Sequence, residues 1–174
     1  MKAVVLPIAL LLLAASLPAQ QVKWNFDKLA ARASDSTDVS LDGSLLQFAG
    51  KFLSDDDKDQ VKIKKLIGGL KGIYVRSFEF KKPGEYTDAD VETFRAPLHS
   101  ADWQRIVGTH SNDDGETTEV YIKNDSKGIG GVVIIATGPK ELTLVNIVGA
   151  VDLDSLSQLG KDFDFPEVKV DKKK

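Results

Sequence analysis

The sequence contains no cysteine, which excludes disulfide bonds, thiolate metal sites and a lipid anchor attached to a cysteine side chain. It has only two histidines, His99 and His110, whereas a zinc site needs three or four ligands. It also lacks the GxSxG and HExxH motifs of serine hydrolases and zinc proteases. The sequence therefore predicts no catalytic, cofactor-binding or metal-binding residue.

An excess of either charge is missing as well. The chain has 23 Lys and Arg residues against 26 Asp and Glu residues, a net charge of −3 at neutral pH. This balance disfavours nucleic-acid binding, which needs a basic surface. With 42% hydrophobic and 28% charged residues, the composition is typical of a soluble globular domain.

Long hydrophobic runs are absent except at the N-terminus. Lys2 precedes an uncharged stretch whose apolar core, Val4 to Leu13, is about half the length needed to cross a bilayer. The small residue Ala19 then stands before polar sequence, as signal peptidase requires, and Ser16 is the alternative cleavage position. We expect residues 1–19 to be a signal peptide and the mature protein to be periplasmic or secreted, without a stable membrane anchor.

The rest of the sequence divides into three parts. Residues 20–34 form a polar, amphipathic segment that contains Trp24 and Phe26. Residues 35–165 have the length and apolar content of one domain, and residues 166–174 form a charged tail. No internal repeat or linker divides the domain.

Helices are predicted where apolar residues recur at intervals of three and four. Asp42 can cap a helix with the apolar stripe Leu45, Leu46, Phe48, Ala49, Phe52 and Leu53. A second helix with Ile63, Leu66, Ile67 and Leu70 ends at Gly68, Gly69 and Gly72. Thr87 and Asp90 resemble a capping box, and Leu153 to Phe163 again has helical spacing.

Strands are predicted at residues 38–41 and 72–80 and, in a consecutive series, at residues 103–110, 117–123, 132–137 and 142–148. Turn residues separate the last four, which indicates an antiparallel meander. This order predicts an α+β fold, a single-domain two-layer sandwich. We expect a mostly antiparallel sheet of about six strands that ends in a four-strand meander, with helices packed on one face.

Three stretches carry a resemblance to a known family: DVSLDGSLLQF at 38–48, KKLIGGLKGIYVRSFEF at 64–80 and PKELTLVNIVG at 139–149. They resemble the exported bacterial family catalogued as domain of unknown function 4252 (DUF4252). The resemblance extends from about Phe26 to Phe163 and implies a bacterial envelope protein, encoded near sigma-factor and anti-sigma genes. It implies no activity, and no catalytic residue follows from it.

Several local patterns are weak candidates for sites. Asp55, Asp57 and Asp59 have the spacing of the first calcium-loop ligands, but Gln60 and Leu66 stand where Gly and Glu are required, which favours a solvated loop. Lys58, Lys62, Lys64, Lys65 and Lys71 suggest a basic helix face, either simply solvated or binding a partner. Acid pairs such as Asp88 with Asp90 and Asp113 with Asp114 are too common to indicate a glycosidase.

Further patterns have ordinary structural explanations beside the functional ones. Gly128, Gly130 and Gly131 look like a phosphate loop but fit the start of a buried strand better. Arg95 and Arg105 could form a cationic patch around Trp103, although simple packing of the ring explains the pattern as well. Asn146, a polar residue inside an apolar strand, is expected to have a satisfied hydrogen bond or an edge position.

Three functional hypotheses remain. The first is a non-catalytic module that binds another envelope protein, linked to envelope or sigma-factor signalling. The second is a carrier of a lipid or other apolar ligand, with a cavity lined by residues such as Phe48, Phe52, Phe78 and Leu144. The third is a hydrolase with an acid-based site that no motif reveals.

Overall fold

A computed structural model describes residues 21–126 and 128–151 of the chain. The expected signal peptide at 1–19, the predicted helix at 153–163 and the charged tail at 166–174 lie outside the described residues. Within those residues, none of the helices has the length and apolar content needed to span a membrane.

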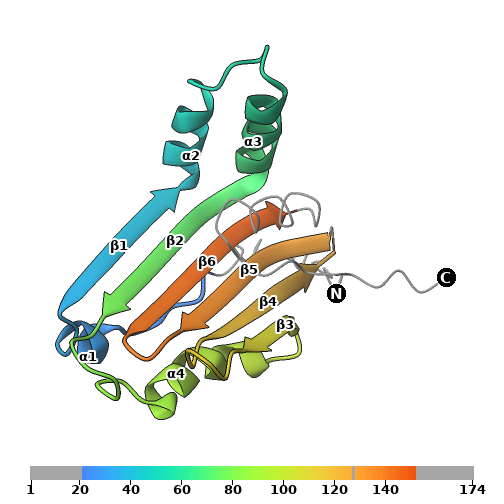
Figure 1. Cartoon of the computed structure of the whole chain (residues 1–174). Helices are drawn as coiled ribbons and strands as arrows, with labels where there is room; N and C mark the ends of the chain where they lie inside the picture. Colours follow the sequence, from blue (N-terminus) through green and yellow to red (C-terminus); the bar gives the residue numbers. More distant parts are fainter. Residues whose placement is uncertain (1–20, 127, 152–174) are drawn as a thin grey trace, which may run out of the picture.

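The described chain folds into one antiparallel sheet with helices. The elements in order are α1 (Asp27–Ala30), β1 (Asp35–Asp42), α2 (Gly43–Gly50), α3 (Lys58–Gly69), β2 (Leu70–Glu79), α4 (Asp88–Arg95), the 3₁₀ helix η1 (Ala96–His99), β3 (Trp103–His110), β4 (Thr117–Asp125), β5 (Gly128–Thr137) and β6 (Glu141–Val151). The strand order is β1-β2-β6-β5-β4-β3 (Figure 1). The predicted α+β sandwich with a C-terminal meander is confirmed.

Local capping signals explain where the helices begin. The carboxylate of Asp42 accepts a hydrogen bond from the Leu45 amide at 2.9 Å and caps α2. Thr87 and Asp90 form the predicted capping box at the start of α4. The second predicted helix, α3, ends at Gly69 and continues directly into β2.

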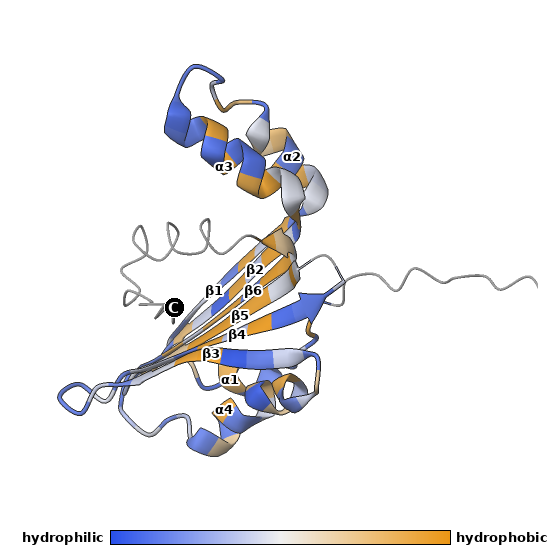
Figure 2. Ribbon diagram, turned by 90° about the vertical axis from the view of Figure 1, so that its right-hand side faces the viewer, coloured by the Kyte–Doolittle hydropathy of each residue, from blue (hydrophilic) through white to orange (hydrophobic). Residues whose placement is uncertain are grey.

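One face of the sheet, which we call the helix-covered face, carries the main core. Phe78, Tyr121, Val133, Ile135 and Leu144 of this face are buried against side chains of α1, α4 and η1. Figure 2 shows α1 and α4 on the same side of the sheet. Burial of these large apolar side chains supplies most of the stability expected of the domain.

The segment before β1 also packs on the helix-covered face. The indole Nε1 of Trp24 donates a hydrogen bond to the carbonyl oxygen of Phe94 at 3.2 Å. The ring of Phe26 stacks on that of Phe94 with a centroid distance of 5.4 Å, and Leu29 of α1 is only 2% exposed. Residues 21–26 have no regular secondary structure, and α1 is the helical part of the expected amphipathic segment.

The opposite face, which we call the second face, is also apolar. Ile122, Val132 and Ile147 of adjacent strands lie side by side on it and are buried. Leu46 of α2 packs against this cluster together with Leu66 and Ile67 of α3. The two helices α2 and α3 therefore pack against the apolar cluster on the second face and contribute no residue to the main core.

The helices α2 and α3 form a helix hairpin, residues 43–69, that stands beyond the end of the sheet (Figure 1). The expectation of helices on one sheet face thus holds for α1, α4 and η1 but not for this pair. Only one side of α2 is buried, at Leu46 and Gly50, and α3 has no buried residue. The predicted apolar stripe of α2 is present, but most of its side chains are not buried in either apolar cluster.

A close backbone contact joins the helix hairpin to β6. Gly149 has φ = +126°, and a Cβ at this position would lie 2.6 Å from the Gly69 carbonyl oxygen. Both the positive φ and the missing side chain are therefore needed for the end of α3 to approach β6 this closely.

Candidate functional site

Leu45, Phe48 and Phe52 of α2 and its C-terminal turn form an exposed apolar surface on the helix hairpin, and Val61 and Ile63 of α3 are exposed as well. These side chains are 49%, 57%, 74%, 41% and 48% exposed, respectively. Leu45, Phe48 and Phe52 follow one another at helical spacing, and the rings of Phe48 and Phe52 touch edge to face at 5.0 Å. Grouped apolar side chains of this size on a surface mark a place where another molecule binds.

An acidic tip, Asp55, Asp56, Asp57 and Asp59, adjoins this surface in the turn between α2 and α3. Asp57 caps α3, and hydrogen bonds from the Gln60 and Asp59 amides lower the pKa of its carboxyl group. Asp55 pairs with Lys64 at 2.7 Å and Asp59 with Lys62 at 3.1 Å. The acidic residues thus cap the helix and form ion pairs, in place of the calcium-loop geometry considered above.

A second candidate is an open groove of about 800 Å³ on the helix-covered face. Its floor is a row of paired residues across neighbouring strands, in which Val148 of β6 stands between Gly72 of β2 and Gly131 of β5. The ring of Tyr74 folds over Gly72, and that of Trp103 approaches Gly131. Gly72 and Gly131 are buried, with the Tyr74 ring over the first and the Trp103 ring beside the second, so the two rings cover the row on either side of Val148, which is 6% exposed.

The charged residues of the groove are mostly basic. Lys23 of the N-terminal segment, Lys71 of β2 and Lys123 of β4 line it, and Asp102 is the only acid among the described residues of the lining. None of the three lysines forms an ion pair or side-chain hydrogen bond within the described parts of the chain. Lys71 therefore belongs to the groove and not, as predicted, to a basic face of the second helix.

Asn146 lies beside the floor of the groove. It is the cross-strand partner of Tyr74 and, two residues before Val148, points to the same sheet face. Its side chain is 3% exposed, and its Nδ2 has no hydrogen-bond partner in the described structure. The expected edge position or satisfied hydrogen bond is wrong, because β6 is a central strand and the amide donor is unpaired.

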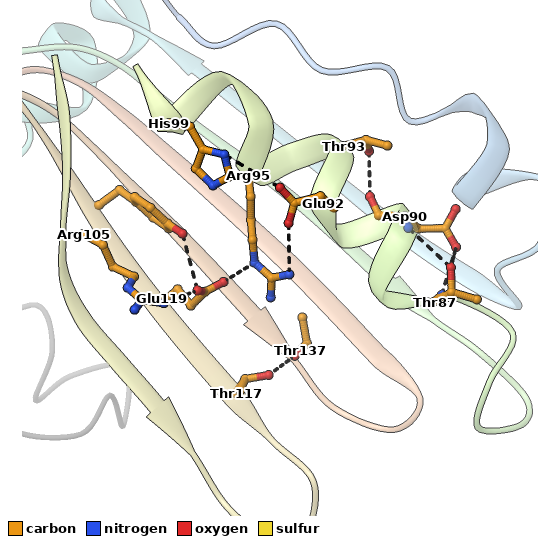
Figure 3. Close-up of polar contacts among 11 residues, drawn as sticks. Thr87, Asp90, Glu92, Thr93, Arg95, His99, Arg105, Thr117, Glu119 and Thr137 are labelled. Carbon is orange, nitrogen blue, oxygen red and sulfur yellow. Dashed lines mark hydrogen bonds and ion pairs between the residues drawn. The ribbon is translucent and has the colours of Figure 1, made fainter. Parts of the chain in front are cut away.

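A buried carboxylate on the same face holds two arginines. Glu119 of β4 is 7% exposed and accepts hydrogen bonds from Arg95 Nε at 2.5 Å and Arg105 Nη1 at 2.9 Å (Figure 3). Burial alone would raise the pKa of Glu119, but the bonds from both arginines outweigh it and lower the pKa. The two arginines thus bind the Glu119 carboxylate and do not form the cationic patch considered around Trp103.

Glu119 is not among the residues predicted from the sequence, because the sequence alone does not show that it lies next to Arg95 and Arg105. The alternation of strand β4 offers a signal, since Glu119 shares its face with the buried Tyr121. A carboxylate at an inward strand position needs a cationic partner, and Arg105 in the preceding strand is in reach.

The remaining sequence candidates are dispersed. Phe48 and Phe52 lie on the helix hairpin, while Phe78 and Leu144 are fully buried in the main core, so the cavity expected among these four is not formed. Asp90 caps α4 and pairs with Arg32 at 2.7 Å.

Neither histidine has the surroundings of a catalytic base. The His99 ring is 3.8 Å from Glu92, and His110 ends β3. Gly128, Gly130 and Gly131 lie in β5, as the strand interpretation predicted.

These features define a single-domain α+β protein with a helix hairpin at one end of its sheet and a basic groove on the helix-covered face. The chain belongs to the family named Domain of unknown function (DUF4252), which it matches over residues 30–159. Comparisons with curated proteins and with solved structures find no match.

Proposed function

We propose that this protein is a non-catalytic module of the bacterial envelope that binds another protein through the exposed apolar surface of its helix hairpin. The observation that carries the proposal is this surface itself. Phe48 and Phe52 are 57% and 74% exposed, next to a domain that buries Phe78, Phe80 and Phe94 almost completely. The predicted export places such a partner in the periplasm or outside the cell.

The position of the hairpin supports a role in binding. It projects past the sheet, so a partner reaches α2 and α3 without meeting the body of the domain (Figure 1). An aromatic pair surrounded by smaller apolar residues resembles the anchors of protein interfaces.

The charges around the apolar surface are mixed. The hairpin carries four aspartates and five lysines, and Asp55 and Asp59 pair with Lys64 and Lys62. A nearly neutral polar rim beside an exposed aromatic pair suits a protein interface. We therefore assign the surface to a protein partner with an apolar centre and a polar rim.

The electrostatics of the described residues support a non-catalytic role. The carboxyl groups with a resolved shift, Asp57, Asp90, Asp114 and Glu119, all have a lowered pKa. General acid catalysis near neutral pH needs a carboxyl group with a raised pKa. The lowered pKa values thus reflect hydrogen bonds and ion pairs that stabilise the ionised form of these carboxylates in the folded protein.

A photo-crosslinking amino acid at position 52, introduced in the native host, tests the proposal. We expect a discrete crosslinked partner, and the purified partner should bind the mature protein and lose at least tenfold in affinity with Phe48→Ser/Phe52→Ser. The matched control is Ile106→Ser, which removes a 38% exposed apolar residue on β3 and should leave affinity unchanged.

Three results would overturn the protein-partner proposal. Crosslinking at position 52 only to a second copy, with dimerisation lost in the double variant, would make the surface a self-association interface. Flotation with vesicles that depends on Phe48 and Phe52 would make it a membrane contact. Equal partner affinity of the wild type and the double variant would remove the surface from binding altogether.

A further inference from the structure

We infer that the groove on the helix-covered face binds an anionic amphiphile, that is, a carboxylate or phosphate head joined to an apolar body. This inference is independent of the partner proposed for the helix hairpin, since the groove and the hairpin surface share no residue.

The size of the groove sets the size of the ligand. About 800 Å³ is within the range of sites for drug-sized molecules and far exceeds a single inorganic anion. The sheet register places Gly72 and Gly131 on either side of Val148, and the rings of Tyr74 and Trp103 lie against these two glycines. The apolar body of the ligand therefore contacts the rings of Tyr74 and Trp103, which line the groove together with Val148.

The charges set the sign of the head. Lys23, Lys71 and Lys123 come from three different parts of the chain and line the groove, where Asp102 is the one acid among the described lining residues. Like charges around one groove repel one another, and an anion among them relieves this repulsion. The N-terminal segment that supplies Lys23 is held in place by the Trp24 hydrogen bond to Phe94.

Asn146 lies beneath the groove and carries an unpaired amide donor. A buried amide donor without an acceptor costs folding free energy, so such donors are rare in native proteins. Its neighbours Tyr74 and Val148 line the groove, whereas Asn146 itself is buried and does not. A ligand oxygen supplies the acceptor that Nδ2 lacks only where the Tyr74 ring moves aside.

Binding is tested with the purified mature protein and four probes: dodecanoate, dodecyl phosphate, dodecanol and inorganic phosphate. Titration calorimetry measures affinity, and the tryptophan emission of the unaltered protein, which has Trp103 in the groove lining, gives a second readout of binding. We expect dodecanoate or dodecyl phosphate to bind with an affinity that falls as salt rises, and dodecanol and phosphate to bind at least tenfold more weakly.

Triple lysine variants distinguish the loss of positive charge in the groove from a general effect on folding. Lys23→Ala/Lys71→Ala/Lys123→Ala should weaken binding of the anionic probe at least tenfold, whereas the matching triple change to Arg should retain it. Lys51→Ala/Lys58→Ala/Lys65→Ala removes the same charge outside the groove and should retain it too. Asn146→Ala should weaken binding severalfold.

The inference is overturned if neither anionic probe binds below millimolar concentration, or if the triple Ala variant in the groove binds as tightly as the wild type. Equal affinity for dodecanol would show an apolar site without charge recognition, and equal affinity for inorganic phosphate would show an anion site without an apolar body.

Discussion

The body of the domain and its helix hairpin use apolar residues in opposite ways. In the body, Phe78 and Phe94 are each 2% exposed between sheet and helices. In the hairpin, α3 buries no residue, and the phenylalanines Phe48 and Phe52 face outward. Apolar side chains thus support the fold in one region and remain exposed to solvent in the other.

The largest expected effect on stability comes from replacing one phenylalanine in each region with alanine. Phe78→Ala should lower the free energy of unfolding by about 3–5 kcal/mol, because it leaves a cavity in the core. Phe52→Ala should change it by less than about 0.5 kcal/mol, since the ring is mostly in water already. Urea unfolding measures both, and a loss of more than about 2 kcal/mol for Phe52→Ala would contradict the comparison.

A smaller effect is expected at the joint between the two regions. Gly149→Ala places a methyl group against the Gly69 carbonyl oxygen at a positive φ and should lower stability by about 2 kcal/mol. Gly68→Ala is the control, because its new Cβ meets nothing within 4 Å and should leave stability unchanged or raise it by up to about 1 kcal/mol. Similar losses for both variants would show that contact with β6 is unimportant.

The smallest effect concerns pH and the body alone. The pKa of Glu119 is lowered in the folded protein, so its stabilisation is complete at neutral pH and is lost as the pH falls through that lowered pKa. Glu119→Gln should cost about 1 kcal/mol at pH 7 and flatten the loss of stability between about pH 5 and pH 3.

Thermal unfolding across this pH range measures the effect of Glu119. The exposed Glu116→Gln is the control and should leave the acid dependence as in the wild type. The assignment to the Arg95–Glu119–Arg105 cluster would fail if both variants showed the same dependence on pH.

Local signals made much of the fold predictable from the sequence. Asp42 and the pair Thr87 and Asp90 start helices through hydrogen bonds to residues at most three positions away. The four-strand meander was predicted because each strand pairs with its neighbour in the chain across a short turn. Such features need no knowledge of distant residues.

What sequence could not predict depends on long-range register. The row of Gly72, Val148 and Gly131 joins three strands, and no single stretch of sequence reveals that the two glycines lie side by side with one residue between them. The stripe of Leu45, Phe48 and Phe52 has the same periodicity whether it meets a core or water. The groove and the exposed apolar surface therefore emerged only from the structure.

The pairing of β2 with β6 also has a consequence for biosynthesis. Its ladder runs from Glu79 with Glu141 to Leu70 with Gly149, so β2 is made some 60 to 80 residues before the strand that completes it. At about 5–20 residues per second, this leaves β1, the helix hairpin and β2 without their partner for several seconds or more. Pairs this far apart in the chain close a long loop, which slows their formation. The newly made β2 thus has one unpaired edge until β6 is made.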